Sequence, residues 1–334
     1  MKILQVGAYP RFEVLEVPTP QPGPGEVLLR VEAVTTCPQW DLHLRHNEPM
    51  FLGHRFQYPY TPGQPGHEAT GTLDAVGEGV NAVKPGDRVS AWRDPGHGRL
   101  GCYAQYVVLN AENVIRVPEH LPYEATASVE LAMCVGATFL MLKEMNALGP
   151  KRVGITGLGP AGLIAAQMAR AEGATEVIGF DLSSVRREYA ASLWVDSAFD
   201  PRDDLSERFP ARPRAAALDL TIDCVGAKAS VEFAMDHTRD FVALFGVQRE
   251  DYTFAPRHYG SLRLCGYPSH SRAAAEYAVD LIAGGRLNLA PLVTTHLPLE
   301  RYGEGIDLLE RQQAIKICFR PWRADTGEIS EPSA

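Results

Sequence analysis

The central part of the chain alternates short apolar runs with segments of helical periodicity. One apolar run, 153–156, precedes a glycine-rich turn at 157–162, and a second run, 177–180, follows a segment whose apolar residues recur at helical spacing. This alternation continues to residue 266. Strands that alternate with helices predict a parallel sheet with right-handed crossovers. We therefore predict a doubly wound α/β domain at residues 140–267.

The beginning and the end of the chain have a different pattern. Before residue 120, short apolar stretches are separated by turns rich in proline and glycine, most densely at 18–25. This pattern is typical of a β-rich domain. A helix at 299–311 and a strand at 315–319 follow the central domain. We predict that residues 1–139 and 268–334 form one discontinuous β-rich domain, with the parallel-sheet domain inserted in it.

The glycine-rich turn has the features of a phosphate-binding loop. Its candidate cofactor-binding residues are Gly157, Gly159, Pro160, Ala161 and Gly162. Glycine permits a tight turn, lets backbone N–H groups approach a pyrophosphate, and lets helix and strand pack closely. The N-terminus of the following helix adds partial positive charge. Because a strand precedes the turn, a helix follows it and an acid ends the next strand, we predict a dinucleotide site rather than an ordinary strand–turn–helix connection.

Asp181 ends the second apolar run and bears on which dinucleotide binds. A carboxylate at this position accepts hydrogen bonds from ribose hydroxyls and repels a 2′-phosphate, which favours NAD(H) over NADP(H). Asp181 could also cap the helix that starts near Ser184. Arg186 and Arg187 follow, and a cation here could accept a phosphate. We expect Arg186 to contact the ribose or the phosphates of NAD.

Composition and charge exclude several classes of protein. The chain has 334 residues, of which 45% are hydrophobic and 22% charged, as in a globular protein with a large core. A net charge of −9 without any lysine or arginine block argues against binding to nucleic acid or to an anionic membrane. No segment resembles a signal peptide or a membrane span. The six cysteines follow no disulfide spacing, so we expect a cytoplasmic protein with reduced thiols or metal ligands.

Several potential metal ligands precede the glycine-rich turn. These are Cys37, the adjacent pair His67 and Glu68, and Cys134. Cysteine, histidine and carboxylate donors with one open position are typical of catalytic zinc. Each residue also has an ordinary interpretation: Cys37 as a small buried side chain, His67 as a hydrogen-bonded core histidine, and Cys134 as part of a helix core. Their spacing by itself leaves both interpretations open.

The sequence around these residues resembles a known family. Residues 66–71, Gly-His-Glu-Ala-Thr-Gly, followed by Gly77 and Val80, match the zinc alcohol dehydrogenase signature at every fixed position. The flanking stretches also resemble the medium-chain dehydrogenase/reductases, and the likeness extends to about Pro321. The resemblance implies a GroES-like catalytic domain, a Rossmann domain, and hydride transfer at zinc between an alcohol and NAD+. It also implies a homodimer or a homotetramer.

The resemblance implies three zinc ligands and leaves a fourth open. Cys37 and His67 match the first two ligands of the catalytic zinc, and Glu68 matches a carboxylate that binds the metal in some members and exchanges in others. For the fourth position, Cys134 matches one form of the family, whereas Glu130 matches the polyol dehydrogenases without the proline of their motif. The spacing to the glycine-rich turn favours Cys134.

The resemblance also bears on the nicotinamide and on proton transfer. Thr138 ends the Cys-x-Gly-x-Thr form of the family, in which the threonine lies near the nicotinamide. The hydroxyl residue that starts the family's proton relay is missing from this chain. Asp41 and His43 are therefore candidate catalytic residues for proton transfer, with water, Thr35 or Thr36 as alternatives.

The predicted function is zinc-dependent hydride transfer between NAD+ and a secondary alcohol, a polyol or a sugar-like compound, with the reverse reaction on the carbonyl. The four cysteines that hold a structural zinc in many members are absent, so we expect one catalytic zinc per chain. One alternative is a zinc-free NADPH-dependent enone or quinone reductase of the same superfamily, against which Cys37, His67 and Glu68 argue. The other is a non-enzymatic member that binds nucleotide.

Overall fold

The computed structural model describes residues 1–51, 53–96, 98–212 and 217–325. The chain forms two compact units, Met1–Met133 with Asn288–Ala334, and Cys134–Leu287. The boundaries predicted at 139/140 and 267/268 differ from these. The larger difference arises because helix α7 (Arg272–Ala283) packs within the second unit. A Cβ atom placed on Gly136 would lie 3.1 Å from the ring of Tyr277 on α7, so the two helices pack closely at this point.

The second unit contains the predicted doubly wound parallel sheet. Adjacent strands are parallel, and the order starts from the centre and runs outward in both directions. In spatial order the strands are β10 (Ser197–Phe199), β9 (Glu176–Phe180), β8 (Arg152–Thr156), β11 (Leu218–Asp223), β12 (Thr238–Leu244) and β13 (Arg263–Gly266). The chain reverses its direction of winding between β8 and β11. Ligands of such sheets bind outside the carboxyl ends of the strands at this switch point.

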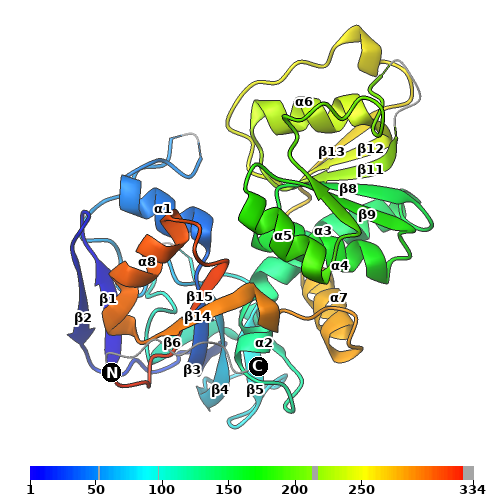
Figure 1. Ribbon diagram of the computed structural model, residues 1–334. Coiled ribbons are helices and arrows are strands. Elements are labelled where there is room, and N and C mark those ends of the chain that lie inside the picture. Colours follow the sequence, from blue (N-terminus) through cyan, green and yellow to red (C-terminus); the bar gives the residue numbers. More distant parts are fainter. Residues whose placement is uncertain (52, 97, 213–216, 326–334) are drawn as a thin grey trace. The chain divides into compact units, whose positions relative to one another are not determined.

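Helices cover both faces of this sheet. Besides α7 they are α3 (Val129–Glu144), α4 (Pro160–Ala171), α5 (Ser184–Leu193) and α6 (Lys228–His237). Figure 1 shows α4 and α5 on one face and α6 on the other. Helix α4 begins with Pro160, whose fixed φ and missing N–H suit the first helical position. It is buried along most of its length and is followed by Gly173 at φ +89°. This burial explains the nearly continuous apolar character of the segment.

The first unit is built on a mainly antiparallel sheet, as the β-rich pattern predicts. A separate hairpin joins β1 (Lys2–Val6) to β2 (Phe12–Glu16). In the sheet, the spatial order is β14 (Val293–Leu297), β15 (Lys316–Phe319), β3 (Glu26–Thr35), β4 (Glu68–Val76), β5 (Arg88–Ala91) and β7 (Val114–Arg116), and β6 (Tyr106–Asn110) also pairs with β3. The helices are α1 (Pro38–His46), α2 (Glu124–Ala127) and α8 (Tyr302–Glu310). Short 3₁₀ turns occur at Ala111–Asn113, Pro256–His258, Ala290–Leu292 and Leu299–Arg301.

The register of three strands in the first unit brings distant parts of the sequence together. β3 lies between β4 and β15 and is antiparallel to both. Thr35, the last residue of β3, pairs with Glu68 on one side and with Cys318 on the other. The end of β3 therefore meets the beginnings of β4 and β15. Residues that follow β3 or open its two neighbours consequently lie at one edge of the sheet.

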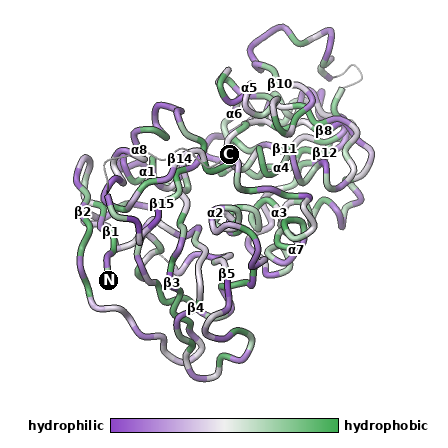
Figure 2. Tube along the Cα trace, turned by 60° about the horizontal axis from the view of Figure 1, so that its bottom comes forward, coloured by the Kyte–Doolittle hydropathy of each residue, from purple (hydrophilic) through white to green (hydrophobic). Residues whose placement is uncertain are grey.

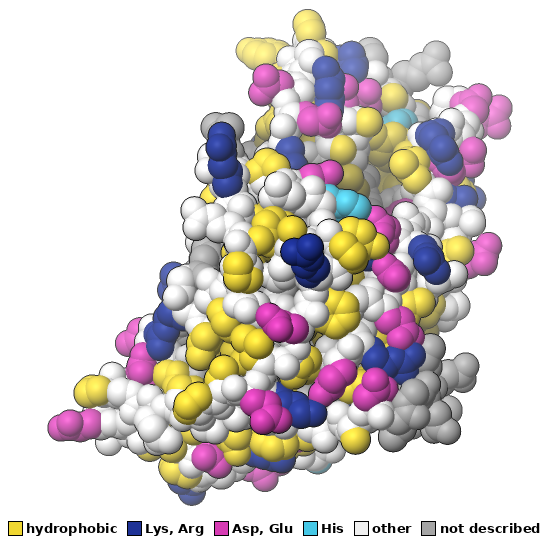
Figure 3. Space-filling view, turned by 90° about the vertical axis from the view of Figure 1, so that its left-hand side faces the viewer, with side chains coloured by type: hydrophobic (Ala, Val, Ile, Leu, Met, Phe, Trp, Pro, Cys, Tyr) yellow, Lys and Arg dark blue, Asp and Glu magenta, His cyan; other side chains and the backbone are white. Residues whose placement is uncertain are grey.

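Hydrophobic residues are distributed through both units rather than concentrated in one long segment (Figure 2). None of the helices in the described ranges is both long enough and apolar enough to span a bilayer. Figure 3 shows one face of the molecule, on which acidic and basic side chains are interspersed.

Candidate metal centre and dinucleotide site

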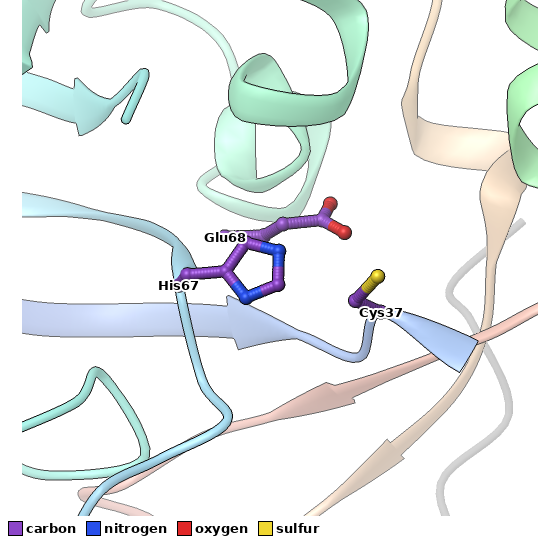
Figure 4. A group of neighbouring side chains, drawn as sticks. All are labelled: Cys37, His67 and Glu68. Atoms are coloured by element: carbon purple, nitrogen blue, oxygen red, sulfur yellow. The ribbon is translucent and has the colours of Figure 1, made fainter. Parts of the chain in front are cut away.

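Three of the predicted metal ligands meet at this edge of the first unit. Cys37 follows β3 and precedes α1, whereas His67 and Glu68 stand at the start of β4. One potential ligand atom from each residue lies within 4.8 Å of the others. Figure 4 shows Cys37 and His67 directed toward a common region beside Glu68. A thiolate, an imidazole and a carboxylate in this proximity form a donor set that suits zinc.

His67 is oriented for ligation through one ring nitrogen. Its Nδ1 lies 2.7 Å from the carbonyl oxygen of Pro65, and because a carbonyl only accepts, Nδ1 carries the hydrogen. This leaves Nε2 as the ligand atom, and such an outer hydrogen bond is typical of metal-binding histidines. Burial lowers the pKa of His67, but the hydrogen bond with Cys37 and the nearby Glu130 carboxylate raise it well above its usual value. In the absence of a metal, this arrangement therefore favours the protonated, positively charged form of His67.

Glu130 and Cys134 lie one turn apart on α3, and a potential ligand atom of each lies within 4.8 Å of the other. A carboxylate oxygen of Glu130, in the first unit, lies 3.7 Å from His67 Nε2. Cys134 is the first residue of the second unit, and its Sγ lies 3.5 Å from Nε2 of His270. The donor that the first unit itself adds to Cys37 and His67 is thus Glu130. The sequence spacing favoured Cys134, and the choice between the two residues stays a prediction.

Glu68 is already bound to a cation that the sequence analysis did not identify. Lys316 Nζ lies 2.6 Å from both carboxylate oxygens of Glu68, and the hydroxyl of Thr35 donates to Oε2 at 3.2 Å. Both charged side chains are fully buried. Burial raises the pKa of the Glu68 carboxyl, although Lys316 opposes this shift. The available signal was a lysine in the middle of the apolar strand 315–319.

Asp41 is fully buried, whereas a residue of a proton relay needs a path to solvent. The hydroxyl of Tyr103 donates to both of its oxygens at 3.0 and 2.9 Å, and that of Tyr302 donates at 2.9 Å. Burial raises the pKa of Asp41 to about 6, although the two tyrosine hydroxyls oppose this shift. Because its oxygens are engaged by two phenols, Asp41 holds α1 against neighbouring elements. The predicted relay role therefore has no support in these contacts.

The other relay candidates also have partners of their own. His43 Nδ1 lies 3.3 Å from the carbonyl oxygen of Glu48, near the end of α1. The hydroxyl of Thr35 contacts Glu68 and Ser128, and that of Thr36 accepts from the N–H of Ile317 at 3.0 Å. Thr35 is the member of this group that reaches a predicted metal ligand directly. From the sequence, Thr35 was only an alternative candidate for proton transfer.

In the second unit, the glycine-rich turn has the close packing expected of a phosphate-binding loop. Gly157 adopts φ +83°, and its N–H donates to the carbonyl oxygen of Phe180 at 2.7 Å. A Cβ atom on Gly162 would lie 1.8 Å from the carbonyl oxygen of Gly157, so only glycine fits there. Gly159 is the N-cap of α4, and Pro160 and Ala161 open the helix. The backbone N–H groups at the N-terminus of α4 are therefore available to bind a phosphate, as is common at helix N-termini.

Asp181 lies beside this turn. Its Oδ2 accepts from the N–H of Leu158 at 2.7 Å and its Oδ1 from the N–H of Ser183 at 2.8 Å. The N-cap of α5 is Ser183, so Asp181 does not fill that alternative role. Arg186 Nη1 lies 3.9 Å from Asp181 Oδ2, close enough to moderate the carboxylate's negative charge. An acid and a cation thus stand together at the position where an adenosine ribose binds in such folds.

Thr138 has an unsatisfied hydroxyl. It lies on α3 within the second unit and is 1% exposed. Among the described residues, its Oγ1 has no hydrogen-bond partner. Buried polar atoms are normally paired, so this hydroxyl is available to a ligand or to an ordered water. An amide such as the nicotinamide carboxamide offers both donor and acceptor groups.

Two family models match separate parts of the chain. Residues 23–119 match the family described as alcohol dehydrogenase GroES-like domain, and residues 160–284 match zinc-binding dehydrogenase. Sorbitol dehydrogenase of Gallus gallus is 28% identical over 345 residues, which cover 91% of each chain. L-threonine 3-dehydrogenase of Pyrococcus horikoshii is 27% identical, over 92% of this chain and 94% of the relative. The structure of galactitol-1-phosphate dehydrogenase from Escherichia coli shares the fold, with a TM-score of 0.79, 24% identity, and coverage of 96% and 100%.

Proposed function

The chain belongs to the zinc-type medium-chain dehydrogenase/reductase superfamily, and from this premise we propose that it is a zinc-dependent dehydrogenase of polyols or related secondary alcohols that uses NAD+. Oxidoreduction of an alcohol or polyol with a nicotinamide cofactor is the activity of this enzyme class. The relatives described above are named for a polyol and for a hydroxy amino acid. We infer the finer points, zinc, NAD and the polyol, from the two sites.

The observation that carries the proposal is the convergence of Cys37, His67 and Glu68 within the first unit, with a Glu130 oxygen 3.7 Å from His67 Nε2. Cys37 and His67 offer one soft and one borderline donor, and Glu130 adds a carboxylate oxygen near His67 Nε2. A Cys-His-carboxylate set that leaves one position open is suited to a catalytic zinc. A carboxylate in the ligand set, in place of a second thiolate, is also the arrangement that the polyol-dehydrogenase motif at Glu130 implies.

Each residue of the proposed centre has a defined task. Cys37 and His67 hold the metal as the principal ligands, and the carbonyl of Pro65 fixes the ring of His67. Glu130 is the third protein ligand that we propose, and Glu68 supports the centre from its ion pair with Lys316. Zinc bound there supplies Lewis-acid chemistry that favours loss of the alcohol proton, and bound NAD+ supplies the hydride acceptor.

The nucleotide residues also have defined tasks. The backbone N–H groups at Gly159–Gly162 bind the pyrophosphate, and Asp181 accepts hydrogen bonds from the ribose hydroxyls. Thr138 donates its buried hydroxyl to the carboxamide, which orients the ring. We propose NAD(H) rather than NADP(H), since Asp181 would repel a 2′-phosphate more strongly than Arg186 attracts it. The ratio of the two dissociation constants in wild type and in Asp181→Ala tests this, because the variant should lose most of the preference.

The test of the proposed function is a metal and substrate assay on the purified chain. We expect about one zinc per chain and NAD+-dependent oxidation of linear polyols or secondary alcohols. Removal of the metal with a chelator should abolish the reaction, and added zinc should restore it. A metal-free protein that reduces enones with NADPH would instead identify the zinc-free reductase. Nucleotide binding without any turnover would favour the non-enzymatic alternative. Sedimentation of the same sample tests the homodimer or homotetramer that we propose.

A further inference from the structure

The hairpin formed by β1 and β2 borders a cavity that lies outside both proposed sites. The hairpin is a two-stranded sheet of its own and appears at the left of Figure 1. An open cavity of about 430 Å³ lies against it, which is within the range of about 300 to about 1,000 Å³ for ligand pockets. Its walls include Gln5, Gly7, Arg11, Phe12, Glu13 and Tyr58. The described residues that line it include none of the candidates for the metal or the nucleotide, so an occupant would be a further ligand.

The register of the hairpin explains how the cavity forms. Gln5 pairs with Glu13, and the N–H of Gly7 donates to the carbonyl oxygen of Arg11 at 2.9 Å. Because side chains alternate between the two faces of a strand, these four residues share one face of the hairpin. Gly7 has no side chain, and a Cβ atom there would lie 3.1 Å from Cβ of Arg11. The space opposite Arg11 is therefore left open.

Two opposite charges border this space. Arg11 and Glu13 are exposed, and neither side chain makes an ion pair or a hydrogen bond with another described residue. Gln5 donates from Nε2 to the carbonyl oxygen of Tyr60 at 3.4 Å, which leaves its side-chain oxygen as a further acceptor. A guanidinium binds a carboxylate through paired N–H groups, whereas carboxylate and amide oxygens accept from an ammonium. The polar groups therefore suit a molecule that carries both a carboxylate and an ammonium.

The rest of the wall is largely apolar and is held in place by contacts of its own. Phe12 is half-buried and packs edge-on against Tyr302, with ring centroids 5.8 Å apart. Tyr58 donates its hydroxyl to the carbonyl oxygen of Leu44, and Pro59 follows it along the wall. Aromatic rings fixed in this way offer a large apolar surface at little entropic cost. The non-polar part of a ligand can lie against them.

We propose that this cavity binds a free α-amino acid with an apolar or aromatic side chain. Arg11 binds the carboxylate, and Glu13 and Gln5 bind the ammonium. The side chain of the amino acid lies against Phe12 and Tyr58. Such a ligand has no net charge, like the pair of charges that receives it. A sugar phosphate or a dicarboxylate fits less well, because the Glu13 carboxylate would repel its second negative charge.

The test uses L-phenylalanine as the probe on the full-length protein. This probe has no hydroxyl group, so a dehydrogenase cannot accept it as an alcohol substrate. We expect isothermal titration calorimetry to show about one bound molecule per chain, with a Kd of about 1 mM or below. Phenylpropanoate lacks the ammonium and phenethylamine lacks the carboxylate, so each should bind at least about tenfold more weakly. Saturating NADH should not displace the probe, because the cavity is not lined by the residues proposed for the nucleotide.

Four variants locate the probe. Arg11→Gln and Glu13→Gln should each weaken binding by roughly tenfold or more, since each removes one charged partner. The matched controls are Arg55→Gln and Glu16→Gln, which should bind phenylalanine as wild type does. Arg55 is an exposed arginine of the same unit that does not line the cavity, and Glu16 is an exposed residue of β2 that lies on the other face of the hairpin from Glu13. All four side chains are exposed, so the variants should fold, and thermal unfolding checks this.

The outcomes separate this site from the proposed enzyme activity. Binding that falls in Arg11→Gln and Glu13→Gln but not in the two controls supports the cavity as the site. The proposal is overturned if phenylalanine does not bind, if all four variants bind it equally, or if NADH displaces it. Zinc content and turnover do not enter this experiment, so a failure of the proposed dehydrogenase function would be seen separately.

Discussion

The two candidate sites are built in opposite ways. The candidate nucleotide site of the second unit lies mostly in one continuous stretch, from Gly157 to Asp181, and its glycine-rich turn offers backbone N–H groups. The candidate metal centre of the first unit draws side chains from separate places in the sequence, at Cys37, His67–Glu68 and Glu130, and Lys316 pairs with Glu68. The first kind of site depends on local backbone conformation. The second depends on strand register, because register alone brings those side chains together.

The two sites should differ in how well they tolerate substitution. A backbone site accepts many side chains, except at positions where any Cβ atom would collide, such as Gly162. A side-chain site loses a ligand with each substitution, and its neighbours are buried polar groups whose partners cannot be removed cheaply. We therefore expect substitutions in the two units to separate metal binding from nucleotide binding.

The largest effect should follow the loss of a principal ligand. Cys37→Ser or His67→Ala should reduce turnover by about a thousandfold or more, because the zinc ion loses one of its strong donors. NADH affinity should change by no more than about twofold, since the residues proposed to bind the pyrophosphate and the ribose are unaltered. Steady-state kinetics, metal analysis and NADH fluorescence titration check this. Full activity of a zinc-free Cys37→Ser protein would show that the zinc mechanism is wrong.

A substitution in the glycine-rich turn should weaken nucleotide binding and leave metal binding unchanged. Gly162→Ala places a Cβ atom 1.8 Å from the carbonyl oxygen of Gly157, so the turn must move away from its phosphate-binding conformation. We expect NADH affinity to fall by roughly a hundredfold, which corresponds to about 3 kcal/mol of overpacking strain. Zinc content should be unchanged. Gly260→Ala is a suitable control within the same unit, because a Cβ atom there meets nothing within 4 Å.

The fourth ligand can be assigned by a matched pair of variants on α3. Glu130→Gln should weaken zinc binding by about 10–100-fold, whereas Cys134→Ser should alter it only slightly, because Glu130 is the residue near His67. Competition with a chromophoric chelator measures both affinities. The opposite ranking would restore Cys134 as the ligand that the sequence spacing favours.

The smallest effect concerns Asp41 and is confined to a window of pH. Its pKa of about 6 in the folded chain lies above the usual value of about 3.9, so the folded state binds the extra proton between these values. Stability of the metal-free protein should therefore fall as the pH rises through this window, by on the order of 2 kcal/mol. Asp41→Asn should remove that part of the slope. Thermal unfolding from about pH 4 to about pH 7 checks this, and an unchanged slope would contradict the assignment.

Much of the fold could be predicted from the sequence, which also gave the candidate residues for both sites. The alternation of strands and helices predicts the parallel sheet, and the glycine-rich turn with Asp181 predicts the nucleotide site. Cys37, His67 and Glu68 could be selected through their motif. These features are local, since neighbouring residues determine whether a segment forms a turn, a helix or a strand.

Only the tertiary structure shows which side chains surround the candidate metal ligands. It placed Glu130 beside His67, paired Glu68 with Lys316, and enclosed Asp41 between Tyr103 and Tyr302. It also assigned α7 to the second unit. None of these contacts joins residues that are close in sequence. They follow from the pairing of β3 with β4 and β15 and from the packing of helices against the sheets, because both are satisfied only when the whole core is assembled.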